Sequence, residues 1–151
     1  MTRAAVTLPL LSLLALAAPL AAQTRHDTSA PIDFGADQIE LQDKANRAVL
    51  SGNVAVKQAE MTLNAARMTV AYTGQVVGGN PQVSRLDASG GVTVKRPDQT
   101  ARGQYAVYDL NRRVITMLGA VRLTQASNTI NGARLTINLD TGRAVIDGSA
   151  V

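Results

Sequence analysis

Three stretches of the sequence decide its fold, because they repeat one another: GNVAVKQAEMTLNAARMTVAY at 52–72, GGVTVKRPDQTARGQYAVYDL at 90–110 and GAVRLTQASNTINGARLTINL at 119–139. They align without gaps over 21 positions, and the first and third share nine identities. A flanking run, RAVLSG at 47–52, returns as RAVIDG at 143–148. Repeats of about 20 to 50 residues predict small units that bury their apolar faces by stacking on their neighbours.

Apolar and polar residues alternate within each unit, as at 54–56, 92–94 and 121–123. Alternation with a period of two indicates β-strands, and no window keeps a helical period. We therefore expect an all-β antiparallel domain of roughly a dozen short strands, each about five to seven residues long.

The repeats also predict where the strands bend. Each unit begins with a glycine in the apolar row, at positions 52, 90 and 119. The apolar positions change parity within 64–66 and 131–133, which indicates a bulge or bend there. The spacing between the first two units is longer and fits a surface loop at 73–81. The sheet is therefore expected to be folded or coiled, not flat.

The composition excludes several kinds of chemistry. The chain has no cysteine, no tryptophan and a single histidine, His26. Disulfides, thiolate nucleophiles and a lipid-modified N-terminal cysteine are therefore excluded. The carboxylates fall mainly in turn sequences, such as Asp98, Asp140 and Asp147, where aspartate is favoured for its backbone hydrogen bonds. We expect no enzyme, no catalytic residue, no cofactor and no metal site.

The N-terminal residues 1–22, MTRAAVTLPLLSLLALAAPLAA, have the layout of a secretory signal peptide, with cleavage expected after Ala22. The alternative is a retained membrane anchor at 4–22, whose 19 uncharged residues are marginally long enough to span a bilayer. Residues 23–31 are polar and predict a flexible lead-in. The folded domain is expected at 32–151, in the periplasm.

The charge of the chain is modestly basic. Without Arg3, 14 Lys and Arg stand against 11 Asp and Glu, a net charge of +3. These charges are spread singly and form no concentrated basic stripe, so nucleic acid is not an expected partner. Arginine is more frequent than lysine, and its paired N–H donors are suited to binding an anionic ligand such as phosphate.

The apolar row has two interpretations. It is an ordinary sandwich core, or it is a partly open groove that accepts flexible acyl chains. The row is aliphatic and notched by glycine, and the chain has only four aromatic residues, although aromatics usually supply much core area. The same scarcity argues against an outer-membrane barrel, which needs two aromatic girdles.

Three segments carry a family resemblance: PIDFGADQIELQ at 31–42, LSGNVAVKQAEMTLNAARMTVAY at 50–72 and VITMLGAVRLTQASNTINGARLTINLDTGRAVIDG at 114–148. In this order, behind a signal peptide, they resemble the OstA-like domains of the LptA family of periplasmic lipopolysaccharide-transport proteins. The resemblance covers the chain from Pro31 onward.

The resemblance implies a V-shaped β-jellyroll whose apolar interior holds the acyl chains of lipopolysaccharide, on a bridge from the inner to the outer membrane. It implies an LptC-like inner-membrane partner, an LptD-like outer-membrane partner and head-to-tail self-association, with no ATP site in the bridge. The positions that match the lipid path are Ile32, Phe34, Leu50, Val54, Val56, Leu63, Met68, Val70, Met117, Val121, Leu123, Leu135, Ile137 and Ile146.

Two alternatives stay open. If residues 4–22 are retained, the chain is the membrane-anchored, LptC-like partner of the same pathway. If the core is closed and dry, it is a purely structural β-repeat protein. Family members commonly continue for another strand beyond the position of Val151, and RAVIDG starts a new unit there, so we expect a sheet edge that accepts a partner strand.

Overall fold

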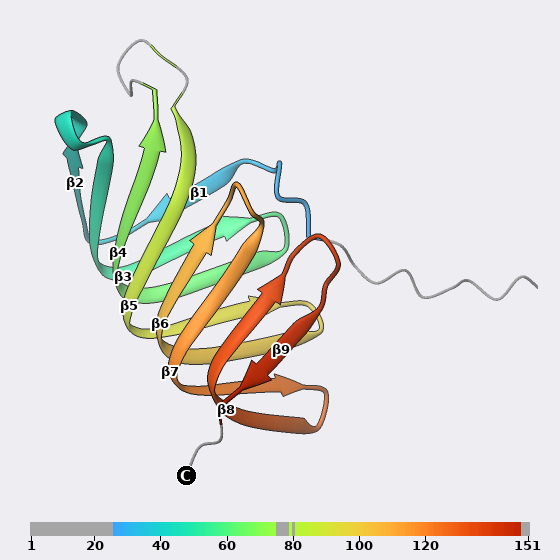
Figure 1. The fold of residues 1–151 in the computed structure, drawn as a ribbon. Helices are drawn as coiled ribbons and strands as arrows, with labels where there is room; N and C mark the ends of the chain where they lie inside the picture. Colours follow the sequence, from blue (N-terminus) through green and yellow to red (C-terminus); the bar gives the residue numbers. More distant parts are fainter. Residues whose placement is uncertain (1–25, 75–78, 80, 149–151) are drawn as a thin grey trace, which may run out of the picture.

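The computed structural model describes residues 26–74, 79 and 81–148 (Figure 1). Within them the chain forms nine strands and one turn of 3-10 helix, η1 at Asp43–Ala45. The strands are β1 Ile32–Gly35, β2 Gln38–Gln42, β3 Arg47–Gln58, β4 Met61–Thr73, β5 Gln82–Arg96, β6 Gln99–Asp109, β7 Val114–Gln125, β8 Asn128–Asn138 and β9 Ala144–Asp147.

All nine strands belong to one antiparallel sheet, ordered β1-β3-β4-β5-β6-β7-β8-β9, with β2 also paired to β3. The two short N-terminal strands share β3: β2 pairs with 47–51 and β1 with 55–58. At the other end, β9 pairs only with 134–137 of β8. Between these ends the chain runs as a plain meander, so strands that follow one another in sequence lie side by side.

A line of bulges crosses the sheet and folds it. In β3, β5 and β7 the pairing shifts at two consecutive residues with positive φ. These pairs are Gly52 and Asn53, Gly90 and Gly91, and Gly119 and Ala120. The bulges bend the strands, and together they make the corner of a V. The predicted bends at the glycine columns and within 64–66 and 131–133 are confirmed.

Glycine is required at the first position of the central pair. At Gly90, where φ is +82°, a Cβ would lie 2.6 Å from the Cβ of Ala66 on β4. That distance is too short for two carbon atoms, and a left-handed backbone already disfavours a side chain. The close approach of β4 to β5 at the corner therefore depends on the missing side chain.

The corner divides the sheet into two halves, which we call wings. The β1 wing comprises β1 and 54–58, 61–65, 92–96, 99–103, 121–125 and 128–132. The β2 wing comprises β2, β9 and 47–51, 67–73, 82–89, 105–109, 114–118 and 134–138. Figure 1 shows the strands from β3 to β8 turning from one wing into the other.

The prediction of a dozen short strands is wrong. The strands from β3 to β8 are 11 to 15 residues long. In sequence the glycines look like strand ends, because glycine and asparagine usually mark turns. Here two left-handed residues bend the strand without breaking its pairing on either side of the bulge.

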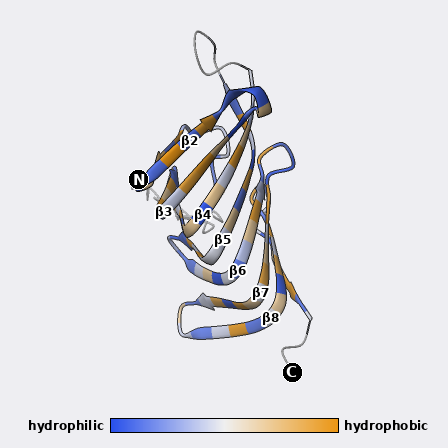
Figure 2. Cartoon of the chain, turned by 90° about the vertical axis from the view of Figure 1, so that its left-hand side faces the viewer, coloured by the Kyte–Doolittle hydropathy of each residue, from blue (hydrophilic) through white to orange (hydrophobic). Residues whose placement is uncertain are grey.

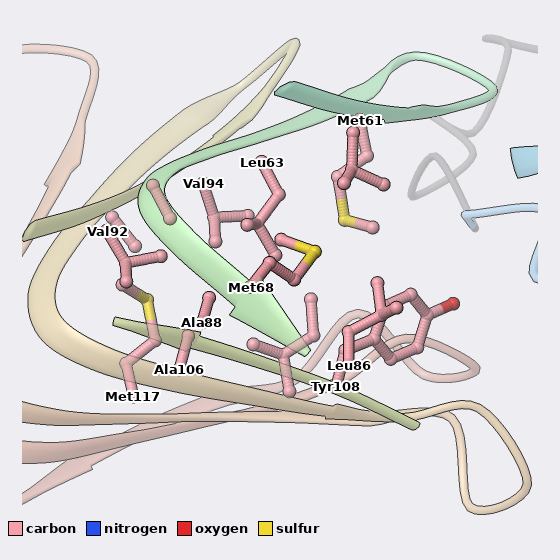
Figure 3. Packing of buried hydrophobic residues seen from close by; sticks show 14 of the residues in the cluster. Met61, Leu63, Met68, Leu86, Ala88, Val92, Val94, Ala106, Tyr108 and Met117 are labelled. Carbon is pink, nitrogen blue, oxygen red and sulfur yellow. The ribbon is translucent and has the colours of Figure 1, made fainter. Parts of the chain in front are cut away.

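The core lies between the two wings. Apolar and polar residues alternate along the long strands (Figure 2), so each strand turns one face inward. Figure 3 shows Leu63 and Val94 of the β1 wing facing Met68 and Leu86 of the β2 wing. Every buried hydrophobic residue among those described belongs to this one cluster.

Several predictions fall on residues that the structure does not describe or describes in part. The signal peptide at 1–22 and residues 23–25 lie outside the described residues. The loop at 73–81 joins β4 to β5, as predicted, and only part of it is described. No helix long and apolar enough to cross a membrane occurs in the described part of the chain.

Candidate functional site

Most of the residues predicted to line a groove are buried between the wings. The buried ones are Leu50, Val54, Val56, Leu63, Met68, Val70, Met117, Val121, Leu123, Leu135 and Ile137. Three others, Ile32, Phe34 and Ile146, lie on the first and last strands and pack half-buried against this cluster. Thus the structure brings all the predicted residues onto one surface, the inner face of the V. Whether lipid contacts them stays a prediction.

The inner surface opens at the N-terminal end of the sheet, in a cavity of about 210 Å³. Its wall comes from both wings: Phe34 of β1 faces residues of the β2 wing. It is lined by Phe34, Ile39, Leu41, Ala48, Leu50, Val70, Tyr72, Pro81 and Val83. The lining is almost entirely apolar, and Ile39 and Leu41 of β2 are about half exposed. We call this cavity the mouth.

Among the described residues that line the mouth, Tyr72 has the one polar side chain, and its hydroxyl is directed to a neighbouring turn. The Tyr72 hydroxyl donates a hydrogen bond of 2.8 Å to Oδ1 of Asp43 in η1. Burial of the ring and this bond to a carboxylate both raise the pKa of Tyr72. The hydroxyl is therefore satisfied outside the cavity, and the ring contributes an apolar surface.

A second, larger cavity of about 620 Å³ adjoins the mouth and shares Phe34, Pro81 and Val83 with it. One side is formed by 28–32 and Gln58, and the other by the turns of the β2 wing, including Leu110 and Arg113. The two cavities together form a continuous opening between the wings.

The structure contains a polar cluster that sequence reasoning missed. Gln58, at the end of β3, is buried with 2% exposure, the one buried polar side chain among the described residues. Its Oε1 accepts a hydrogen bond of 2.7 Å from the Tyr108 hydroxyl and lies 2.8 Å from Nε2 of His26. Its Nε2 donates to the carbonyl oxygens of Thr28 and Ala30, both at 3.0 Å. The side-chain amide of Gln58 thereby uses both of its N–H donors and both acceptor positions of its oxygen.

This Gln58 cluster joins three parts of the molecule. Gln58 belongs to the β1 wing and Tyr108 to the β2 wing, so their hydrogen bond crosses the V. A tyrosine hydroxyl is already protonated at neutral pH, and burial raises the pKa of Tyr108 further, to about 12. The sequence does hold one sign of this cluster. Gln58 is polar, but it continues the inward-facing row of Val54 and Val56, which indicates a buried polar side chain.

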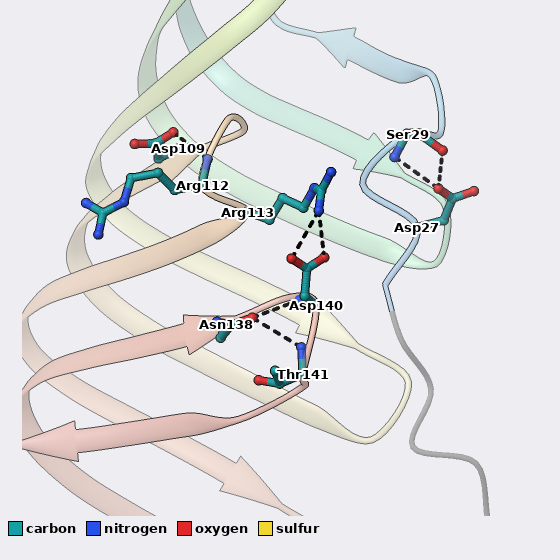
Figure 4. Close-up of polar contacts among 8 residues, drawn as sticks. All are labelled: Asp27, Ser29, Asp109, Arg112, Arg113, Asn138, Asp140 and Thr141. Atoms are coloured by element: carbon teal, nitrogen blue, oxygen red, sulfur yellow. Dashed lines mark hydrogen bonds and ion pairs between the residues drawn. The ribbon is translucent and has the colours of Figure 1, made fainter.

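The lead-in predicted at 23–31 is described from residue 26 onward, and its flexibility stays a prediction. Residues 26–31 lie against the end of β3 through the Gln58 cluster. Ser29 adds a local turn, donating from its N and Oγ to Oδ1 of Asp27 at 3.0 and 2.6 Å (Figure 4). These bonds lower the pKa of Asp27. The segment therefore has a defined path across the wing tips, which we call the strap.

The two ends of the inner surface differ. Leu63 is 2% exposed, as predicted for an inward residue, but its repeat counterpart Ile130 is 52% exposed. Two residues in the same column of the repeat therefore differ in burial. The physical reason is that β9 covers only 134–137 of β8, so 128–132 has a strand neighbour on one side alone in the described structure.

The outer face is polar and carries exposed ion pairs. Arg85 binds Asp87 at 2.9 Å, and Arg134 binds Asp147 at 3.1 Å. Arg113 reaches Asp140 at 3.2 Å between two turns of the β2 wing (Figure 4). All these groups are about half exposed, so each pair contributes little stability.

Of the carboxylates expected in turns, Asp98 and Asp140 do lie in turns, whereas Asp147 is the last residue of β9. Asp98 lies in the turn from β5 to β6, and Asp109 ends β6 and accepts a bond from the Arg112 amide at 3.1 Å. No group of three His, Asp or Glu residues that could hold a metal ion occurs among the described residues. What the described site offers is a large aliphatic surface with an apolar opening.

One family model matches most of the chain. The family model described as LptA/(LptD N-terminal domain) LPS transport protein matches residues 34–143. An uncharacterized protein of Rhizobium meliloti (strain 1021) is 34% identical over 121 residues, which are 78% of this chain and 65% of that protein. This chain thus spans about two thirds of the length of that relative.

A solved structure shows the same fold. The crystal structure of LptH, the LptA-homologous periplasmic component of the lipopolysaccharide transport device of Pseudomonas aeruginosa, superimposes with a TM-score of 0.70. The match covers 82% of this chain and 87% of that one at 21% identity. The predicted antiparallel β-jellyroll is confirmed. With the family match over most of its length, the chain belongs to the LptA and LptD N-terminal domain family of lipopolysaccharide-transport proteins.

Proposed function

We propose that this protein is a periplasmic carrier and bridge for lipopolysaccharide, whose acyl chains lie against the inner face of the V. The observation that carries the proposal is the mouth: the aliphatic interior reaches the surface there through an almost wholly apolar cavity lined from both wings. An acyl chain that enters at Phe34 meets apolar side chains along its whole path from β3 to β8.

The energetics suit a carrier. Burying an acyl chain of about a dozen methylenes at roughly 0.8 kcal/mol each contributes on the order of 10 kcal/mol. The dense core must open to admit such a chain. Across the V the described wings are held by side-chain packing and by the bond between Gln58 and Tyr108. Opening about the corner therefore leaves the strand pairing of each wing intact.

The sheet ends suit partners of the same fold. The outer edges of β1 and β2 end the sheet on one side, and 128–132 of β8 lacks an outer neighbour on the other in the described structure. Unpaired edges accept further strands. We propose an LptC-like inner-membrane protein and an LptD-like outer-membrane protein as the partners, with head-to-tail copies of this chain between them.

The location follows from the proposed processing. Residues 1–22 act as a signal peptide, 23–31 lead into the domain and 32–151 form it. The second candidate is the membrane-anchored partner with 4–22 retained. The intact mass of protein from the cell envelope separates the two, since a chain that starts at Gln23 excludes the anchor and a full-length chain excludes the soluble bridge.

Native mass spectrometry of the full chain with lipopolysaccharide tests the binding itself. Phe34→Glu places a charge in the mouth, and Lys57→Glu places the same charge on the exposed outer face of neighbouring β3. We expect the Phe34 variant to lose bound lipopolysaccharide and the Lys57 variant to keep it. Equal binding by both variants, or none by the parent protein, contradicts the proposal and favours a structural repeat protein with a dry core.

A further inference from the structure

The outer face of the β1 wing carries more positive than negative charge. Lys57, Lys95, Arg102 and Arg122 are exposed on this face. Among the strand residues of this wing the one acidic residue is Asp33. The three ion pairs of the described structure all lie on the β2 wing and its turns.

Two of these cations face one another. Arg102 of β6 and Arg122 of β7 are direct cross-strand partners. Like charges in that position destabilise a sheet. No carboxylate in the described structure forms an ion pair with either guanidinium. The arrangement costs stability in the free protein, and an anion between the two side chains would remove that cost.

A hollow and an orienting contact accompany the pair. A cavity of about 400 Å³ is lined by Arg102, Ala120, Val121, Arg122, Asn131 and Gly132, with no acidic residue. Nε of Arg122 donates to Oδ1 of Asn131 at 3.3 Å. That contact uses one of five guanidinium donors and fixes the direction of the others.

We propose that Arg102 and Arg122, with Asn131 as a positioning residue, form a binding site for a phosphate group on the outer face of the β1 wing. Paired guanidinium groups match the geometry of phosphate oxygens, which accept two parallel hydrogen bonds from each. The site is separate from the inner surface, because both arginines alternate with the inward residues Ala101, Val121 and Leu123. The phosphate belongs to a soluble compound or to a phospholipid headgroup at a membrane surface.

Titration of the full chain distinguishes the two sources. One arm adds pyrophosphate and the other adds vesicles of phosphatidylglycerol, with backbone amide chemical shifts as the readout. Shifts at Arg102, Arg122 and Asn131 with pyrophosphate alone identify a soluble ligand, and shifts with vesicles alone identify a headgroup. Shifts in both arms identify a site that reads the phosphate itself. No shift at these residues in either arm overturns the proposal.

Charge-matched variants separate a site from diffuse attraction. Arg102→Gln and Arg122→Gln are each expected to weaken binding about tenfold, the loss of one charge-assisted contact. Lys57→Gln removes the same charge from the same face and is expected to change binding less than about twofold, because exposed distant charges are screened. Equal weakening by all three variants overturns the proposal.

Stability without ligand supplies an independent readout. If the opposed guanidiniums repel one another, Arg122→Gln raises Tm at low salt, and the gain shrinks as salt is added. Lys57→Gln has no cross-strand cation to relieve, since its partners are Asp33 and Thr62, and it is expected not to raise Tm. A fall in Tm for Arg122→Gln contradicts the proposed cost of the empty pair.

Discussion

The first and third repeat units differ in what surrounds them, although their sequences are closely similar. Gln58 and Gln125 occupy the same column, but Gln58 is buried in a hydrogen-bonded cluster and Gln125 is exposed. Leu63 and Ile130 also share a column, and only Leu63 is buried. The first unit lies inside the sheet beneath the strap, and the third lies near its end.

This difference shows that burial in a repeat sheet is set by neighbours as much as by residue type. Leu63 has β3 on one side and β5 on the other. Ile130 has only β7. A repeat column therefore predicts the direction in which a side chain points, whereas the place of the unit in the stack decides whether it is covered.

The largest expected effect on stability is at the column of the repeat that holds Leu63 and Ile130. Leu63→Ala removes a fully buried side chain and is expected to lower the free energy of unfolding by about 2 to 5 kcal/mol. Ile130→Ala removes an exposed one and should cost about 0.5 kcal/mol or less. Urea denaturation of both variants measures the difference, and equal losses contradict the assignment of covered and uncovered ends.

The glutamine column gives the next effect. Gln58→Ala leaves the Tyr108 hydroxyl and the Thr28 and Ala30 carbonyl groups without their partner, at an expected cost of about 1 to 3 kcal/mol. Gln125→Ala is the matched control and should be nearly neutral. Amide hydrogen exchange at 26–31 is expected to rise only in the Gln58 variant; unchanged exchange there means that the strap is held by other contacts.

The repeat units all contribute a glycine to the corner, and substitution there is expected to lower stability by a similar or smaller amount. Gly90→Ala is expected to cost about 1 to 2 kcal/mol more than Gly91→Ala. Both positions have a φ near +80°, but a Cβ at Gly90 meets Ala66, whereas nothing lies within 4 Å of a Cβ at Gly91. Thermal denaturation of the two variants measures the cost of the contact with Ala66, because the backbone conformation is the same at both positions. Identical Tm values would mean that Gly90 is not required by close packing at the corner.

The smallest effect is a pH dependence at the buried end. Tyr108 ionises near pH 10 when unfolded, and burial raises its pKa to about 12 in the fold. Between these values the unfolded chain binds fewer protons, so stability falls as pH rises through this window, by roughly 1 to 2 kcal/mol. Tyr108→Phe should lose less stability than the parent from pH 9.5 to 11.5. Tyr105→Phe, at an exposed position, should follow the parent; a Tyr108 variant that does the same rules out this linkage.

The sequence predicted the antiparallel fold, the corner and the inward residues because each depends on a local pattern. Alternation marks the inner face, and glycine columns mark the bulges. It did not predict the strand lengths, because two left-handed residues in a bulge look like a turn. The Gln58 cluster was also missed, since its partners His26, Thr28 and Tyr108 are distant in sequence and come together only when the V is folded. The exposure of Ile130 depends on which part of β8 is paired with β9, and the sequence of the third repeat unit does not indicate this.

The central claim is that the inner face of the V is a lipid path and the outer face is not. Photocrosslinking in cells that make lipopolysaccharide tests it most directly, with a photoreactive amino acid at Phe34 or at its neighbour Asp33 on β1. The side chain of Phe34 lines the mouth, and that of Asp33 is exposed on the other face of the same strand. We predict that the probe at Phe34 captures lipopolysaccharide and the probe at Asp33 does not. Equal capture at the two positions, or capture at Asp33 alone, contradicts the account.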